Sequence, residues 1–115
     1  MSTVYKNRQG HERGWLPITV GSSYTGSALY MKVEGNEVVL RGQATRTSGN
    51  LTFGDNVATV LSGFEPAYTV TATGQSGSYR TAKISCATDG TINLVSGTSG
   101  TDTYIRLDGI RYPLN

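Results

Sequence analysis

Tyrosine and arginine are the residues of this sequence that suggest a binding site. The chain has seven tyrosines against two phenylalanines and one tryptophan. Aromatic faces pack against the C–H surfaces of sugars, while Arg and Asp supply directional hydrogen bonds, so their clustering is typical of a shallow saccharide site. For any single tyrosine, packing at the edge of a core is the more common role, and only the cluster argues for binding. The candidate ligand-binding residues lie in or beside predicted loops: Tyr24, Arg46, Tyr79, Arg80, Asp102 and Tyr104.

Residues suited to catalysis are scarce. A hydrolytic nucleophile needs a base beside it, usually histidine, and the single histidine is His11 in an unpatterned N-terminal stretch. A glycosidase needs two facing carboxylates, which only the fold can bring together. The glycines are spaced as turn residues, without the strand-to-helix context of a phosphate-binding loop. We therefore expect no enzyme activity and no cofactor.

Metal ligands and thiols are equally sparse. Glu34 and Glu37 flank a tight turn, and the aspartates stand apart, so no metal site is expected. Calcium on Asp55 or Asp102 with loop carbonyls stays open, although isolated turn aspartates usually bond their own backbone. Cys86 is the one cysteine and lies in an apolar alternation, which predicts a small buried hydrophobic residue and excludes an internal disulfide.

Length and charge limit the architecture. A chain of 115 residues has room for one core, and its net charge of +2 comes without any run of like charge, so nucleic-acid binding is not expected. The N-terminus has no apolar core of the kind a signal peptide needs, and no apolar run is long enough for membrane insertion. We expect a soluble head domain over residues 15–115, preceded by a lead or the end of a shaft over residues 1–14.

Short strands are the elements that must position the candidate site. Apolar residues alternate with polar ones on both sides of Gly35-Asn36, which predicts a tight hairpin, and a second hairpin turns at Thr88–Gly90. The predicted strands cover 15–20, 29–34, 38–41, 57–61, 68–73, 81–86, 91–95 and 103–114, the last one broken or bulged at 108–109. The expected fold is all-β: a single antiparallel β-sandwich, jelly-roll or Greek-key-like, of about eight or nine strands.

The order of reversals places the long connections together. If every connection reverses the chain, the tight turns at Gly35-Asn36 and Asp89-Gly90, the segment 62–67 and Trp15 all lie at one end, where Trp15 closes the base of the sandwich. The longer connections, 21–27, 47–55, 74–78 and 96–102, then lie at the other end. Rigid strands that hold loops away from the attached end form a typical binding scaffold.

The order of motifs from Trp15 onward resembles the C-terminal receptor-binding domains of siphophage tail fibres and minor tail proteins. The similar segments are Trp15, 29–33, Gly35–Gly42 (GNEVVLRG), Gly63–Pro66 (GFEP), Asp89–Ile92 (DGTI) and Tyr104–Tyr112 (YIRLDGIRY). The resemblance covers about a hundred residues and involves framework positions. It implies a β-sandwich head, trimeric assembly and attachment to a host surface, and it assigns no residue to receptor contact.

Three functions remain open from the sequence. The first is a homotrimeric head in the virion that binds cell-wall polysaccharide or another surface glycan and joins other tail proteins through its N-terminal side. A structural tail or capsid-decoration module and a stand-alone carbohydrate-binding module are the alternatives. The candidates for a trimer interface are Ile105, Ile110, Tyr112 and Leu114, and burial of these residues in the chain's own core is equally open.

Overall fold

Twelve short strands make up the regular structure of the computed structural model, which describes residues 14–26, 28–77, 80–97 and 102–114. No helix occurs in these ranges, so they contain no helical membrane span. The strands are β1 (Leu16–Pro17), β2 (Thr19–Val20), β3 (Tyr24–Thr25), β4 (Tyr30–Glu34), β5 (Glu37–Arg41), β6 (Gln43–Arg46), β7 (Asn56–Thr59), β8 (Val70–Gln75), β9 (Thr81–Cys86), β10 (Thr91–Gly97), β11 (Tyr104–Arg106) and β12 (Arg111–Pro113).

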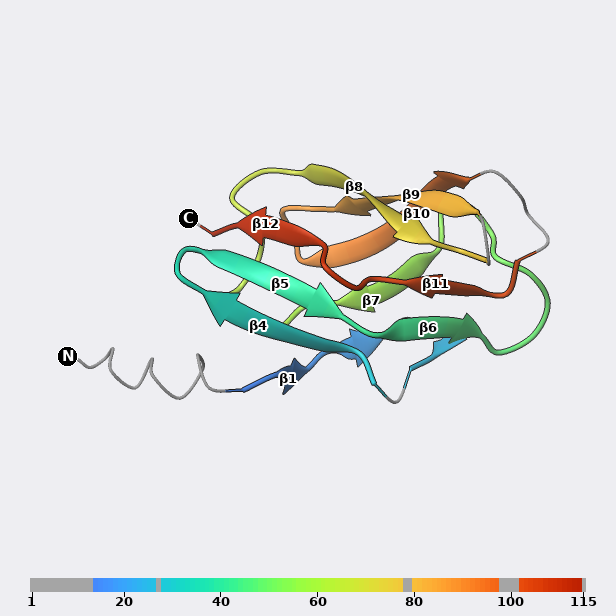
Figure 1. The fold of residues 1–115 in the computed structure, drawn as a ribbon, viewed down its shortest axis with the longest axis horizontal. Coiled ribbons are helices and arrows are strands. Elements are labelled where there is room, and N and C mark those ends of the chain that lie inside the picture. Colours follow the sequence, from blue (N-terminus) through green and yellow to red (C-terminus); the bar gives the residue numbers. More distant parts are fainter. Residues whose placement is uncertain (1–13, 27, 78–79, 98–101, 115) are drawn as a thin grey trace.

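The strands form two layers with the core between them (Figure 1). One layer joins a four-stranded sheet, in the order β1-β4-β5-β12, to a three-stranded sheet, β11-β6-β3. These two sheets follow one another because β5 continues into β6 across Gly42, and β11 continues toward β12. The other layer is the five-stranded sheet β2-β7-β10-β9-β8. The chain enters by crossing between the layers, since β1 pairs with β4 and β2 pairs with β7.

The predicted antiparallel all-β sandwich is confirmed. Every strand pair is antiparallel, and the order β7-β10-β9-β8 is that of a Greek key. Four pairs of segments, β1–β2, β3–β4, β5–β6 and β11–β12, each continue in one direction, so the twelve segments amount to eight runs. All eight predicted strands overlap these runs, and the predicted break at 108–109 separates β11 from β12.

Two strands were not predicted. The segment 21–27 was expected to be a loop, yet β3 within it pairs with β6, Tyr24 opposite Arg46 and Thr25 opposite Thr45. β3 has two residues, and β6 reads Gln-Ala-Thr-Arg with a single apolar side chain, so neither shows the alternation that marks a strand. Both are strands because they pair with neighbours: β3 pairs with β6, and β6 also pairs with β11.

Apolar alternation correctly identified the core. Leu29, Met31 and Val33 turn inward from the β4 run and are buried, as are Ile92 and Leu94 of β10. This is the pattern expected of antiparallel strands with one face against the core and one face in solvent.

Cys86 is buried at the end of β9, as the sequence predicted. Burial in apolar surroundings raises the pKa of its thiol to about 11. A thiol in this state is an unreactive packing group.

The expected interface residues Ile105, Ile110 and Tyr112 lie in the core instead. Their side chains are at most 4% exposed, so they have no surface to offer a second chain, and their assignment to a trimer interface is wrong. The Tyr112 hydroxyl donates a hydrogen bond to the carbonyl oxygen of Phe64 at 2.6 Å, which ties β12 to the 60–69 connection. Leu114 is partly buried against the core, and its interface role stays a prediction.

Trp15 does not close the base of the sandwich. Its half-buried ring packs instead against side chains of β4 and β5. The Arg41 guanidinium lies 4.4 Å and the Lys32 ammonium 5.5 Å from the ring centre. The Arg41 guanidinium also lies 5.3 Å from the centre of the Tyr30 ring. These cation–π contacts hold the start of β1 against the outer face of β4 and β5.

The predicted separation of the connections between two ends is confirmed (Figure 1). At what we call the distal end, the Thr47 amide donates to the Ser23 carbonyl and the Leu51 amide donates to that of Asp102, so three of the longer connections touch. At the proximal end, the Ala67 amide donates to the Pro113 carbonyl and the Leu114 amide to that of Asn36. The first and last described residues both lie toward this proximal end.

Gly42 permits the bend between β5 and β6, and its replacement tests that bend. Gly42 has φ +118°, and a Cβ there would overlap the carbonyl oxygen of Ala28. We expect Gly42→Ala to lower the free energy of unfolding by about 3 kcal/mol or more, measured by urea denaturation. Gly35→Ala is the matched control: Gly35 has φ +62° with open space around it, and its cost should be about 1–2 kcal/mol. Equal losses in the two variants would show that the Ala28 contact is unimportant.

Candidate functional site

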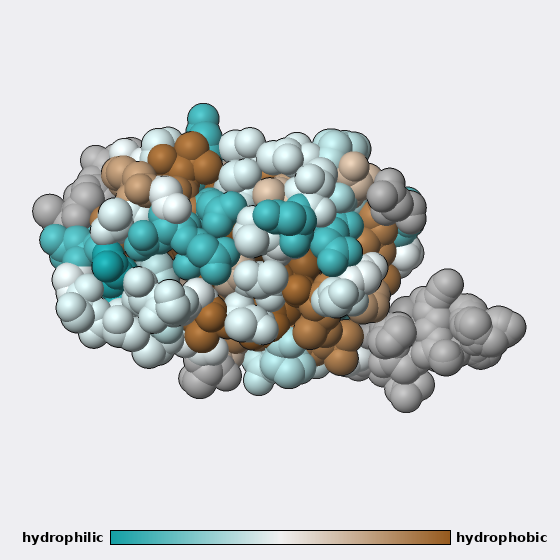
Figure 2. Space-filling view, turned by 180° about the vertical axis from the view of Figure 1, so that it is seen from behind, coloured by the Kyte–Doolittle hydropathy of each residue, from teal (hydrophilic) through white to brown (hydrophobic). Residues whose placement is uncertain are grey.

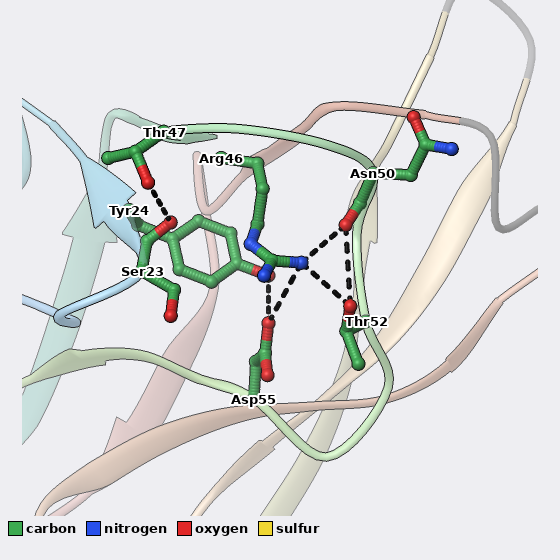
Figure 3. A network of polar contacts seen from close by, with 7 residues as sticks. All are labelled: Ser23, Tyr24, Arg46, Thr47, Asn50, Thr52 and Asp55. Carbon is green, nitrogen blue, oxygen red and sulfur yellow. Dashed lines mark hydrogen bonds and ion pairs between the residues drawn. The ribbon is translucent and has the colours of Figure 1, made fainter.

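A polar network joins three elements beneath the distal end (Figure 3). Tyr24 from β3 donates its hydroxyl hydrogen to Asp55 Oδ2 at 3.0 Å, and Arg46 Nη1 from β6 lies 3.6 Å from the same oxygen. The Arg46 guanidinium also lies 5.8 Å from the centre of the Tyr24 ring. Burial and the hydrogen bond to Asp55 raise the pKa of Tyr24 to about 12, so the phenol stays protonated and keeps donating.

The same arginine fixes the connection that follows its own strand. Arg46 Nη1 donates to the carbonyl oxygen of Asn50 and, at 2.7 Å, to Thr52 Oγ1. The Thr47 hydroxyl donates to the Ser23 carbonyl at 3.2 Å, which ties the loop to its neighbour (Figure 3). A loop held in this way has already lost the conformational entropy that binding would otherwise cost. The 47–55 connection is therefore preorganised.

A second network joins Asp102, the last residue of the 96–102 connection, to Ser76 of the 74–78 connection and to Arg80. Arg80 donates from Nε and Nη2 to the carboxylate of Asp102, at 2.9 and 2.7 Å, and Ser76 Oγ donates to Oδ2 at 3.1 Å. The Asp102 side chain is 5% exposed, while that of Arg80 is 47% exposed. The hydrogen bonds from Arg80 hold the pKa of this carboxyl below its usual range, with a further contribution from Ser76.

Some side chains of the distal end are exposed to solvent, wholly or in part. Phe53 is 40% exposed, and a Cβ on Gly97 would lie 3.1 Å from its ring, which places the ring beside the end of β10. The amide side chain of Asn50 and the outer part of Arg80 are also exposed. We call Asn50, Phe53 and Arg80 the distal surface. It presents an aromatic ring, an amide and a guanidinium. In Figure 2 the distal end is on the left, and most of the coloured surface there is hydrophilic or neutral.

The structure assigns different roles to the predicted site residues. Tyr24 and Asp102 are both buried, so the expectation that they present side chains to a ligand is corrected. Both side chains brace the connections from within, and the Arg46 side chain does the same. Tyr104 lies on β11 opposite Thr45, half-buried, with Arg106 5.9 Å from its ring centre.

Arg80 and Tyr79 are the remaining predicted contact residues. Arg80 remains exposed beside Asp102, and its contact with a receptor stays a prediction. Tyr79 lies outside the described residues.

Asp55, Ser76 and Phe53 are the important residues that the site prediction missed. Asp55 was considered only as a calcium ligand, and its partners Tyr24 and Arg46 are distant in sequence. Within the described ranges, no three His, Cys, Asp or Glu side chains come close enough to share a metal ion. The one available signal for Phe53 was an aromatic residue beside a Gly in a polar connection, which does not distinguish exposure from burial.

Fold and site together define an antiparallel β-sandwich that holds braced connections at the end remote from its first and last described residues. This architecture is shared with a solved structure described as the crystal structure of the receptor binding protein (gp15) of Listeria phage PSA. The TM-score is 0.67 at 20% sequence identity, and the match covers 97% of this chain and 73% of the other. No protein-family description and no curated protein matches the chain. At this identity, the likeness establishes the fold.

The Asp102 brace should make stability depend on pH. A carboxyl whose pKa is lowered on folding stabilises the protein above its unfolded pKa, and this contribution is lost as pH falls through the folded value. We expect wild type to be more stable than Asp102→Asn at pH 7, with the difference shrinking below about pH 4, where an unfolded Asp titrates. Urea denaturation between pH 2 and pH 7 measures it.

Glu37→Gln is the matched control for the Asp102 experiment. Glu37 forms an exposed ion pair with Arg111 at 3.3 Å, which typically contributes about 0.5 kcal/mol. A difference between wild type and Asp102→Asn that is constant down to pH 2 would contradict the Asp102 assignment.

Proposed function

We propose that this chain is the receptor-binding domain of a bacteriophage tail protein and attaches the virion to a saccharide on the host surface. The observation that carries the proposal is the polarity of the scaffold: the braced connections lie at one end and the described termini at the other. A domain joined to a virion by its proximal end would direct the distal surface toward the cell. The shared fold with the receptor binding protein (gp15) of a Listeria phage supports the same role.

The chemistry of the distal surface fits a saccharide. A sugar offers C–H faces to an aromatic ring and hydroxyls to amides and guanidinium groups, and Phe53, Asn50 and Arg80 supply these groups. Because the connections beneath them are held by Arg46 and Asp102, binding should cost little loop ordering. These groups support a role in recognition.

Assembly as a homotrimer completes the proposal. A shallow site binds one sugar weakly, and three such sites on one rigid body gain avidity without any new contact. Residues 1–14 would connect the head to a shaft and to other tail proteins on the proximal side. Of the four residues first considered for the subunit contact, Leu114 alone is outside the fully buried core.

Binding to cells should depend on Phe53. We expect Phe53→Ala to weaken binding of a fluorescent fusion to bacterial cells at least about tenfold, because a partly exposed aromatic anchor carries much of the energy of a small interface. Tyr68→Ala is the matched control, since Tyr68 is an aromatic side chain that is 62% exposed near the proximal end. Binding to a panel of strains that includes Listeria is measured by flow cytometry.

Four outcomes would count against the proposal. Equal loss in both aromatic variants would contradict the assignment of the distal surface. Binding that survives chemical removal of wall polysaccharide would contradict a saccharide receptor. Oligomerisation without binding to any strain would favour a purely structural tail module, and degradation of the polysaccharide by the purified protein would indicate an enzyme.

The mass in solution tests the assembly. We expect light scattering with size-exclusion chromatography to give three times the chain mass of 12.3 kDa, independent of concentration in the micromolar range. A stable monomer would contradict the trimeric head and favour the stand-alone carbohydrate-binding module.

A further inference from the structure

A second candidate binding region lies on the outer face of the five-stranded sheet, toward the distal end. A hollow of about 210 Å³ opens there over β8, β9 and β10. Pockets for drug-sized ligands usually measure about 300–1,000 Å³, so this one suits a single sugar residue. Its lining residues are Thr73, Thr81, Ala82, Lys83, Ser96 and Gly97.

Three polar side chains form a row across the hollow. Lys83 is the register partner of Thr73 on one side and of Ser96 on the other, so the three lie next to one another across the strands. Cross-strand partners of this kind have Cβ atoms about 5 Å apart. The row presents hydroxyl, ammonium and hydroxyl groups, which is a suitable set of partners for the hydroxyls of a sugar.

These three side chains are not engaged within the protein. In the part of the chain that the structure describes, Thr73, Lys83 and Ser96 form no side-chain hydrogen bond or ion pair. Farther along the same sheet, polar side chains bond one another: Asn93 donates to Thr91 Oγ1 at 3.0 Å, and Asn56 donates to Asn93 Oδ1 at 3.3 Å. The donors and acceptors of the row are therefore open to a ligand, in contrast to the bonded groups near Asn93.

The charge of the hollow favours an anion. Lys83 is the one charged residue of the lining, and no Asp or Glu is among the lining residues. The carboxylate of Asp102, on the nearby 96–102 connection, is already paired with Arg80. An ammonium group without a carboxylate partner attracts a negatively charged ligand and can form a charge-assisted hydrogen bond to it.

An exposed apolar side chain flanks the row. The pairing of β10 with β9 shifts between Leu94 and Ser96, so Val95 is an extra residue in the strand, and it is 45% exposed. A bulge of this kind re-aims side chains and interrupts regular pairing. Val95 thereby adds apolar surface next to Ser96, against which the C–H groups of a sugar ring can pack.

We propose that the hollow on β8, β9 and β10 is a subsite for an anionic sugar residue, one that carries a phosphate or a carboxylate, with Lys83 binding the anion and Thr73 and Ser96 binding sugar hydroxyls. The inference rests on the proposed receptor-binding function and specifies its ligand class. It extends the contact region from the distal connections onto the adjoining face of the sheet.

Titration followed by NMR tests the subsite directly. With ¹⁵N-labelled protein, millimolar glucose 1-phosphate and glucuronate should shift the amide signals of Thr73, Lys83 and Ser96 in a saturable way, and neutral glucose should bind at least about tenfold more weakly. A response to one of the two anions alone identifies which acidic group is recognised. Shifts of equal size and affinity with inorganic phosphate alone would overturn the saccharide part of the proposal.

Variants locate the interaction. Lys83→Gln should reduce the affinity for the charged sugars about tenfold, Lys83→Arg should restore part of it, and Ser96→Tyr should block binding by filling the hollow. Lys32→Gln on the opposite sheet is the matched control, because it changes the net charge equally. Retained ¹⁵N spectra of the variants show that each one is folded.

Failure of the subsite and failure of the proposed function give different results. No shift with either charged sugar, shifts scattered over the whole surface, or equal weakening by Lys83→Gln and Lys32→Gln would each overturn the subsite. If the protein still binds cells in a Phe53-dependent manner, the receptor-binding function stands without it. Loss of cell binding in Lys83→Gln, with Lys32→Gln unaffected, would support both.

Discussion

The architecture depends on a bend in one layer of the sandwich, at the point where β5 becomes β6 and β11 becomes β12. The Gly42 amide donates to Asp108 Oδ1 at 2.8 Å, the Leu107 amide donates to the Gly42 carbonyl, and the Gly109 amide to that of Leu40. These bonds join the β5–β6 segment to the β11–β12 segment at the bend, so the two segments bend together. Beyond the bend lies the small sheet β11-β6-β3, which carries Tyr24 and Arg46 to the distal connections.

Polar side chains that face one another brace the described part of the distal end. Tyr24, Arg46 and Asp55 form one brace, and Arg80 and Asp102 form another. Charged groups lose hydration when they are buried, so such pairs contribute little net stability compared with apolar packing. They do fix the positions of neighbouring backbone segments, which is what a recognition surface built on loops requires. Three of the side chains predicted to bind a ligand, Tyr24, Arg46 and Asp102, thus fix the distal connections instead.

Sequence patterns predicted the part of the fold that follows from hydrophobic burial. The hairpins of β4–β5 and β9–β10 alternate apolar and polar residues and end in Gly-containing turns, so both their existence and their inward faces were predictable. The separation of long and short connections followed from counting reversals. β3 and β6 were not predictable, because pairing with neighbours, and not their own composition, makes them strands.

The errors in the site prediction have a common physical origin. Period-two patterning shows which residues share a face and does not show what covers that face, so Ile105 and Tyr112 were compatible with a subunit contact as well as with the core. Likewise, a Tyr, Arg or Asp in a connection has the same composition whether it is bonded internally or open to a ligand. Tyr24 and Asp102 required their partners Asp55 and Arg80 to be known.

Whether a side chain is paired within the protein or open to solvent therefore distinguishes most of the bracing residues from most of those proposed to bind a ligand. A change at a paired residue such as Arg46 would release the 47–55 connection and alter the whole distal end. A change at Phe53 or Lys83 would alter a contact and leave the bracing intact, because neither side chain belongs to either network. A sandwich built in this way could change the proposed ligand contacts without losing its fold, since the side chains of Phe53, Asn50 and Lys83 lie outside both braces and Arg80 alone belongs to a brace and to the distal surface.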